Sequence, residues 1–441
     1  MAGLGGGLRK LFAADTRRGV LSQGDPSLLE LLDLNLLRKE AHEADVAAGR
    51  VGAKDRPQRL LESAVVWREV ARRTADAAAL RKSASAAELA WSGFEREGRA
   101  DCARRARRNQ AYAAMLGADL FGEDGLNAAA EFVLSQGQDS PKTRGALARL
   151  SARRVLAAGG VSEALSASAK FDGPLQVLEA RDKPAASRLR CERAELLAGC
   201  GARLHDPLLF DMALKDADVA LRGLDPAYRP LTWLHVLEIR GFALIGLGET
   251  HADTGPVVDA VSILTTAADH LTPDHSPLDW ARIHNVLGQG LAALGEAEAC
   301  EGAFERALEQ YGHALRVLRQ FPSPALRAAV ALNRAGCMVR RAEIAGDLYA
   351  LDEAEAIFRS ELAALGRPVD ETSWAVLQMN LARVYIARAA ANGRDRGEAA
   401  RAADALTGAL EVFNELGLRS IAVLAAQELE RLRQGSRRLA N

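Results

Sequence analysis

The feature that most constrains the fold of this chain is a pattern that returns about every 47 residues. The segment 233–249 aligns with 280–296, and the two share a tryptophan, two glycines and a closing Leu-Gly-Glu. A small residue at the centre of the pattern recurs at spacings of 47, 48 and 46 residues, at Gly241, Gly288, Gly336 and Ala382. Weaker copies precede it at 184–194 and 141–151. Such a register is typical of stacked, repeated units and argues against independent globular domains.

The recurring small residue predicts a helical hairpin. Where two antiparallel helices cross closely, a large side chain would hold the backbones apart, so Gly, Ala or Ser is favoured at the crossing. Each expected partner helix carries small and large apolar residues at helical spacing on one face: Ala260, Leu264, Ala267, Ala307, Tyr311, Ala314, Ala354, Phe358, Ala402, Leu406 and Ala409. Restart signals follow at Pro226, Pro277, Pro324 and Asp370. The unit is therefore expected to be a helix-turn-helix.

These motifs resemble tetratricopeptide repeats, through Leu-Gly in the first helix, Ala before a large apolar residue in the second, and a closing Leu224-Asp225-Pro226. The usual unit of that family is about 34 residues, so this period implies longer helices or an enlarged turn, for which 295–302 is the candidate. The segment Pro277–Ala281, Pro-Leu-Asp-Trp-Ala, is similar to extended bacterial arrays. The resemblance is good over 184–415, poorer over 57–183 and absent before. It implies an all-α, right-handed superhelical solenoid.

The pattern divides the chain into five parts. Residues 1–25 form a Gly-rich leader that we expect to be disordered, and 26–55 an amphipathic segment with a helix from Asp25-Pro26 to about Ala48. One face of that helix carries Leu28, Leu29, Leu32, Leu36 and Leu37; it would dock into the groove as a lid or pair with a second copy. Degenerate hairpins fill 57–183, repeats fill 184–416, and 417–441 holds a capping helix near 421–433 and a tail.

Charge and cysteine content limit the cellular compartment and the classes of partner that we expect for the chain. Basic and acidic residues number 57 and 58, so no global field attracts nucleic acid or an anionic membrane. No signal-peptide run follows Arg9-Lys10, and charges interrupt every long apolar stretch, which predicts no spanning helix. Five cysteines without a Cys-x-x-Cys pair favour a reducing cytoplasm. The Ala, Arg, Gly and Leu bias indicates a GC-rich bacterial genome.

The sequence carries no catalytic or metal-binding signature. Gly288 and Gly290 lack the third glycine of a dinucleotide-binding loop. The histidines between His251 and His284 lack metal-ligand spacing, and no cysteine has a neighbouring histidine with a supporting acid. We therefore expect neither an enzyme nor a metal or cofactor.

The concave face of the first helices supplies the candidate binding residues. Positions on one face of these helices carry polar side chains, at Glu238, Asn285, Gln289, Asn333, Arg340, Arg341 and Arg383. An Asn amide holds an extended backbone through both its edges, and Arg offers a planar fork to a carboxylate. The set predicts an acidic or C-terminal peptide ligand.

The chain is thus expected to be a non-catalytic scaffold that holds a peptide or a helical segment of a partner protein in its groove. One alternative is a regulatory sensor of a small molecule or signal peptide. Another is a nucleic-acid adaptor that uses arginines such as those in 104–108, although acidic neighbours and missing aromatic interleaving argue against it.

Overall fold

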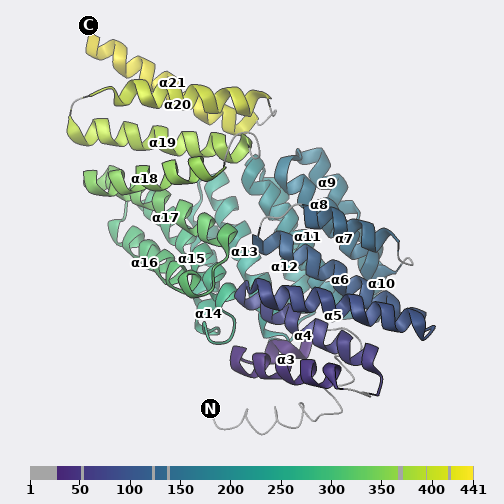
Figure 1. The fold of residues 1–441 in the computed structure, drawn as a ribbon. Helices are drawn as coiled ribbons and strands as arrows, with labels where there is room; N and C mark the ends of the chain where they lie inside the picture. The colour runs from purple at the N-terminus through teal and green to yellow at the C-terminus, as the bar shows by residue number, and fades with distance from the viewer. Residues whose placement is uncertain are drawn as a thin grey trace.

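The computed structural model describes residues 27–50, 54–121, 125–136, 140–365, 371–393, 395–415 and 419–440. Over these residues the chain is a stack of antiparallel helical hairpins without strands (Figure 1). The first helices of the hairpins are α4 (Arg56–Thr74), α6 (Ala100–Phe121), α8 (Pro141–Ala158), α11 (Lys183–Leu204), α13 (Pro230–His251), α15 (Pro277–Glu298), α17 (Pro324–Ala345) and α19 (Glu371–Asn392). Their partners are α5 (Ala77–Arg96), α7 (Gly125–Ser135), α9 (Val161–Ala169) with α10 (Asp172–Arg181), α12 (Pro207–Arg222), α14 (Thr254–Asp269), α16 (Glu301–Gln320), α18 (Leu348–Leu365) and α20 (Glu398–Glu415).

This architecture confirms the predicted all-α solenoid of tetratricopeptide-like hairpins. The long period comes from long helices: α13, α15, α17 and α19 each have 22 residues. The expected enlarged turn at 295–302 is wrong, because α15 continues to Glu298 and only Ala299 and Cys300 separate it from α16. Ala299 takes the left-handed conformation (φ 49) and its N–H caps the helix on the Gly295 carbonyl, which reverses the chain in two residues.

The helix starts agree with the sequence signals in part. Pro277 and Pro324 are the first residues of α15 and α17, where a missing N–H costs nothing. Pro226 instead precedes α13 by four residues, since that helix begins at Pro230. Asp370 lies outside the described residues.

The faces predicted for the second helices form the core. Ala260, Leu264, Ala307 and Phe358 have no exposed surface, and Tyr311 is only 1% exposed. The other positions named for these faces are buried as well. The helical period of small and large apolar residues was therefore sufficient to locate the packed side.

The N-terminal segment differs from the single helix expected over 26–48. A 3-10 helix, η1 (Ser27–Leu31), is followed by α3 (Leu34–Gly49), whose N-cap Asp33 accepts a 2.8 Å hydrogen bond from the Leu36 N–H. This cap starts a new helix, so the leucines separate: Leu29, Leu32 and Leu37 are buried, whereas Leu36 is 51% exposed. The leader 1–25 and the expected Asp25-Pro26 start lie outside the described residues.

At the other end, α21 (Arg419–Ala440) packs against α20. It is longer than the helix expected near 421–433. Ala422, Ala425 and Leu429 are its buried face, so it covers the last hairpin as a solenoid end requires.

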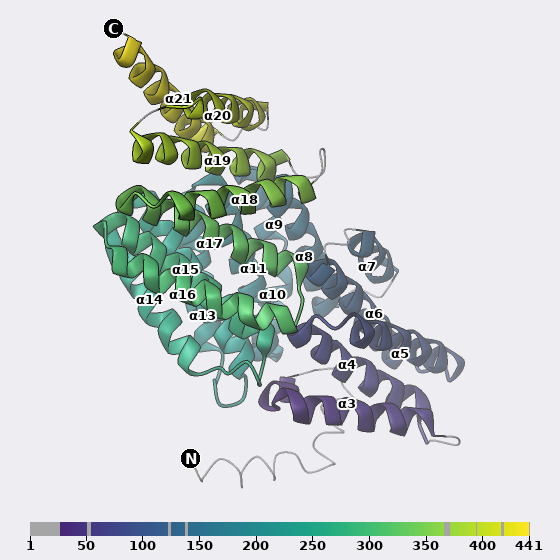
Figure 2. The ribbon, with the colours of Figure 1, turned by 60° about the vertical axis from the view of Figure 1, so that its left-hand side comes forward.

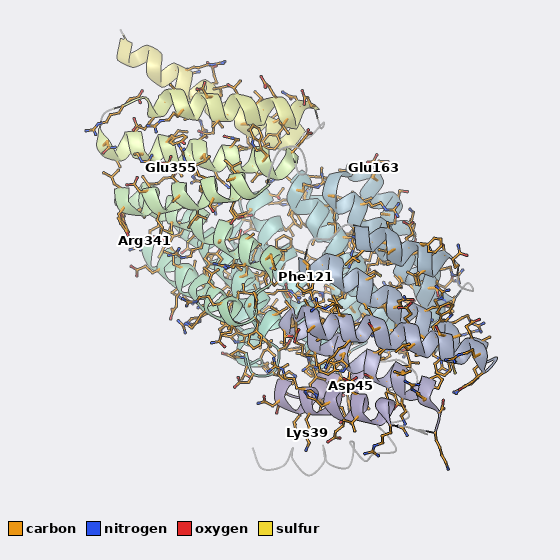
Figure 3. The ribbon with its side chains drawn as sticks, viewed as in Figure 1. Lys39, Asp45, Phe121, Glu163, Arg341 and Glu355 are labelled. Atoms are coloured by element: carbon orange, nitrogen blue, oxygen red, sulfur yellow. The ribbon has the colours of Figure 1, made fainter. Side chains whose placement is uncertain are left out.

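The stack does not remain open along its length. Residues 27–136, which we call the N-terminal arm, turn back so that α4 contacts α15 and α6 contacts α17 of the C-terminal array, residues 183–440 (Figures 1 and 2). Ala75 and Leu120 of the arm join the same apolar cluster as Leu244 and Leu287 of the array. Phe121, labelled in Figure 3 at this junction, packs against that cluster.

Arg73 of α4 secures this closure from inside the protein. Its guanidinium has no exposed surface and donates to the carbonyls of Leu29 (2.7 Å), Leu32 (2.6 Å) and His275 (3.2 Å), and to Glu69 (2.7 Å). One side chain therefore joins η1, α4 and the turn before α15. Because a buried guanidinium is costly when unpaired, the three segments are expected to stay together.

One helix, α13, is long and apolar enough to cross a membrane by length and composition alone. In the fold, 56% of its most apolar window is buried, against α11, α12, α14 and α15, as in the core of a helical repeat.

Two glycines in equivalent positions provide a test of the helix-crossing argument. A methyl group on Gly288 would lie 2.6 Å from a ring carbon of Tyr311, whereas one on Gly336 would meet no atom within 4 Å. We expect Gly288→Ala to destabilise the fold by about 1–3 kcal/mol through overpacking. Gly336→Ala should be neutral or stabilising by up to about 1 kcal/mol, because alanine favours helix. Urea unfolding of both variants measures this, and equal losses would contradict the argument.

Candidate functional site

The candidate site is a cavity of about 790 Å³ between the N-terminal arm and the C-terminal array. Its walls come from the first helices α4, α6, α8, α11, α13 and α15, with contributions from η1 and the start of α17. Helices from both arms thus enclose one space, and the concave face predicted from the sequence is a pocket rather than an open groove.

The first turns or caps of several helices lie in the cavity wall. Pro141, Pro184, Thr232 and Ser323 line the cavity and belong to the first turns or caps of α8, α11, α13 and α17. Helix N-termini carry partial positive charge and unpaired N–H groups. Glu195 of α11 lies eleven residues further along its helix than Pro184, or about 16 Å at 1.5 Å per residue. We call the region around Pro141, Pro184, Thr232 and Ser323 the N-terminal end of the cavity.

Ion pairs cross the middle of the cavity wall. Arg149 of α8 lies 3.1 Å from Glu192 of α11 and 3.4 Å from Asp119 of α6. Burial raises the pKa of Asp119, and Glu195 adds to that effect, while Arg149 and Arg153 oppose it. These groups fix α6, α8 and α11 relative to one another on the cavity side.

His235 of α13 is the second charged centre of the wall. Its Nδ1 lies 3.2 Å from Glu238 and its Nε2 4.0 Å from Glu195. Burial alone would lower the pKa of His235, but its hydrogen bonds to Cys191 and Glu238 raise it well above the ordinary value. Burial raises the pKa of the Cys191 thiol. The imidazole thus lies between the carboxylates of Glu195 and Glu238.

A third cluster, the inter-arm ion pair of Arg72 and Asp279, joins α4 to α15. Arg72 donates through one nitrogen to both oxygens of Asp279, at 2.9 and 3.0 Å, and through two others to Glu69, both at 2.9 Å. Asp279 also accepts from Ser276 (2.6 Å) and Arg282 (2.7 Å). Burial alone would raise the pKa of Glu69, but the guanidinium groups of Arg72 and Arg73 lower it to about 2.

Three of the seven predicted binding residues line the cavity, and a fourth, Asn333, contacts one of them. Glu238, Asn285 and Gln289 line it, and Asn333 donates a 3.0 Å hydrogen bond from its amide to the Asn285 oxygen. Asn285 is only 7% exposed. Its own amide N–H₂ makes no hydrogen bond to the described part of the chain, and Asn285 lines the cavity.

The other three residues, all arginines, do not line the cavity. Arg340 lies 2.9 Å from Glu296, and Arg383 lies 2.6 Å from Glu343 and 3.2 Å from Glu296. These pairs connect α15, α17 and α19 in succession. Their geometry links neighbouring repeats, so a ligand carboxylate would have to displace a protein carboxylate.

Arg341 points to a different neighbour. It lies 3.2 Å from Glu301 and 3.3 Å from Glu305 of α16. In Figure 3 it is at the edge of the array remote from Phe121. Adjacent arginines on a helix point about 100° apart, which is why Arg340 and Arg341 do not share a face.

Sequence reasoning missed the groups that the N-terminal arm supplies, among them Arg68, Arg72, Tyr112 and Asp119. It also missed the contact between Cys191 and His235, which lie 44 residues apart on neighbouring helices. The two residues occupy different positions of the repeat, three residues before Ala194 and six before Gly241, so the period gave no signal for this contact. Among the described residues there is no group of three potential ligands suited to a metal ion.

Comparison with known proteins finds similarity to solved structures alone. No protein-family model and no curated protein matches the chain, whereas 53 solved chains do. A Rap protein complexed with competence and sporulation factor is 11% identical, covering 90% of this chain and 98% of that one, with a TM-score of 0.49. Yeast Tom70 is 12% identical over 92% and 96%, with a TM-score of 0.22. The APC/C hetero-tetramer Cut9–Hcn1 is 17% identical over 92% and 97%, with a TM-score of 0.23. Likeness at this level does not define a shared function.

The lowered pKa of Glu69 predicts how stability depends on pH. A carboxyl group whose pKa falls from 4.5 to about 2 on folding stabilises the fold fully above pH 4.5, and that contribution is lost as the pH falls toward 2. It is on the order of 3 kcal/mol. We expect Glu69→Gln to be less stable at pH 7 and to lose less stability on acidification than the unmodified chain. Chemical unfolding between pH 7 and pH 3 tests this; parallel pH profiles would contradict it.

Proposed function

We propose that this chain is a non-catalytic binding protein that holds a short, extended peptide in the cavity between its N-terminal arm and its C-terminal array. The observation that carries the proposal is the pair Asn285 and Asn333. Asn333 fixes the orientation of the Asn285 amide, so the remaining N–H₂ donors of Asn285 are positioned in advance for the carbonyl groups of a peptide backbone. Gln289, one turn further along α15, adds a second amide on the same wall.

The size of the cavity favours a short peptide. Ligand pockets have volumes of about 300–1,000 Å³, and this one is about 790 Å³. A ten-residue helix, about 10 Å wide and 15 Å long, would fill roughly 1,200 Å³. The cavity therefore suits a segment of fewer than ten residues, and it is the amide pair Asn285 and Asn333 that favours the extended form.

The charges of the wall favour a ligand with both signs of charge. Eight basic and six acidic side chains line the cavity, and several of them already pair with one another. A peptide with free or charged ends would replace some of these internal ion pairs with ion pairs of its own, at a modest cost in free energy. An acidic or C-terminal peptide remains our proposed ligand class, since the helix N-termini at one end favour a carboxylate.

A regulatory sensor is the second candidate, and one observation favours it. The cavity lies between two arms that the inter-arm ion pair joins. A ligand that contacts both the N-terminal arm and the C-terminal array would change the stability of their closed arrangement. It would thereby change the surface that the two parts share. In this form the same site would respond to a signal peptide or a small molecule.

The nucleic-acid alternative receives no comparable support. The arginines of 104–108 point to different partners: Arg104 pairs with Asp101, Arg107 stacks over the Trp91 ring at 3.7 Å, and Arg108 faces the cavity. They do not form one phosphate-binding surface. All five cysteines are free, in keeping with the proposed cytoplasmic location.

The proposal is tested with a library of synthetic pentapeptides that have free termini. We expect at least one peptide to bind the full chain, and Asn285→Ala to weaken it by about tenfold or more, since two backbone hydrogen bonds are lost. Isothermal titration measures both affinities. The peptide should show only modest salt dependence, unlike a nucleic acid.

The matched control is Asn392→Ala, the same substitution at an exposed position at the end of α19. It should bind like the unmodified chain. If no peptide binds, or if Asn285→Ala binds as tightly as the control and circular dichroism shows both folded, the groove assignment is wrong.

A further inference from the structure

The N-terminal end of the cavity holds a carboxylate that comes from a distant part of the chain. Glu30 of η1 lines the cavity, and its carboxylate accepts from the backbone N–H of Thr232 (2.9 Å) and from the Thr232 hydroxyl (2.6 Å). Arg188 of α11 lies 3.4 Å from the same carboxylate. Three donors from two helices of the array thus converge on one anion from the arm.

The helix that receives this carboxylate has no cap of its own. Its N-cap residue, Arg229, makes no side-chain hydrogen bond to the helix. By contrast, Asp206 and Asp253 cap α12 and α14 from the preceding residue. Thr232 is the third residue of α13, where N–H groups lack an intrahelical acceptor. The Glu30 carboxylate, which comes from outside the helix, therefore caps α13 as a local Asp caps α12 and α14.

The position is also open to a ligand. Thr232, Arg229 and Arg188 line the same cavity as Asn285, and the Arg188 side chain is 39% exposed. η1 itself is held through its backbone by Arg73 and by His275, whose Nε2 lies 2.7 Å from the Glu30 carbonyl, so release of the Glu30 carboxylate would leave these backbone contacts in place. Exchange therefore does not require η1 to unfold.

We propose that the N-terminus of α13, with Thr232 and Arg188, is a carboxylate-binding subsite of the cavity, filled by Glu30 in the free chain and by a ligand carboxylate in the complex. The identity of the ligand as a peptide rests on the proposed function; the subsite itself does not. Glu30 competes for the subsite as a group tethered to the protein. A ligand bound elsewhere in the cavity holds its own carboxylate near the subsite at a similar effective concentration, and can therefore displace Glu30.

The test is chemical rescue of Glu30→Ala with acetate, compared with chloride at equal ionic strength and with acetamide as the neutral isostere. We expect the variant to melt at a lower temperature than the unmodified chain. Saturating acetate should raise that temperature by about 2 °C or more, and acetamide should not. If Glu30→Ala does not fold in chloride, acetate should restore its helical circular dichroism signal.

The triple variant Glu30→Ala/Thr232→Val/Arg188→Ala removes both side-chain donors as well as the anion, leaves only the backbone N–H at position 232, and should lose most of the response to acetate. An equal response of all variants would mean a general salt effect, and no response of Glu30→Ala would mean that the contact is purely structural; either result overturns the proposal. Acetate rescue requires neither a peptide nor Asn285. A failed rescue therefore leaves the pentapeptide titration unaffected, and a failed pentapeptide titration does not contradict the carboxylate subsite.

Discussion

The closure of this solenoid depends on the buried guanidinium of Arg73. A charge with no exposed surface is tolerable only when every side of it is hydrogen bonded, and Arg73 meets that condition through Glu69 and through backbone carbonyls of η1 and of the turn before α15. Those acceptors lie about 40 and 200 residues from it in the sequence. An open arrangement would remove the His275 carbonyl, the acceptor that the C-terminal array supplies.

The cavity follows from that closure. Once α4 is fixed beside α15, the inter-arm ion pair forms at its edge and α6 comes to face α11 and α13 across a space of about 790 Å³. The walls then carry charges that satisfy one another in the free chain, as Glu30 does at the N-terminus of α13. A preformed site of this kind gains specificity by exchanging its internal partners for those of a ligand.

Much of the proposed site was accessible to sequence reasoning. Asn285, Asn333 and Gln289 were located by their place relative to the recurring small residue, because equivalent positions of a repeat face the same side. The same rule failed for the arginines. Arg340 and Arg383 extend to carboxylates of neighbouring repeats, and a side chain of that length is directed by its partner as much as by its position on the helix.

The sequence by itself determined the hairpins, their length and their buried faces, since each depends on contacts within about 47 residues and leaves a periodic trace, such as Ala307 and Tyr311 beneath Gly288. It did not determine the break after η1, the return of the arm, or the cavity. Those depend on single contacts without a period, above all Arg72 with Asp279 across 207 residues. Only the tertiary structure decided them, because one long-range ion pair has no repeated signature from which it could be recognised.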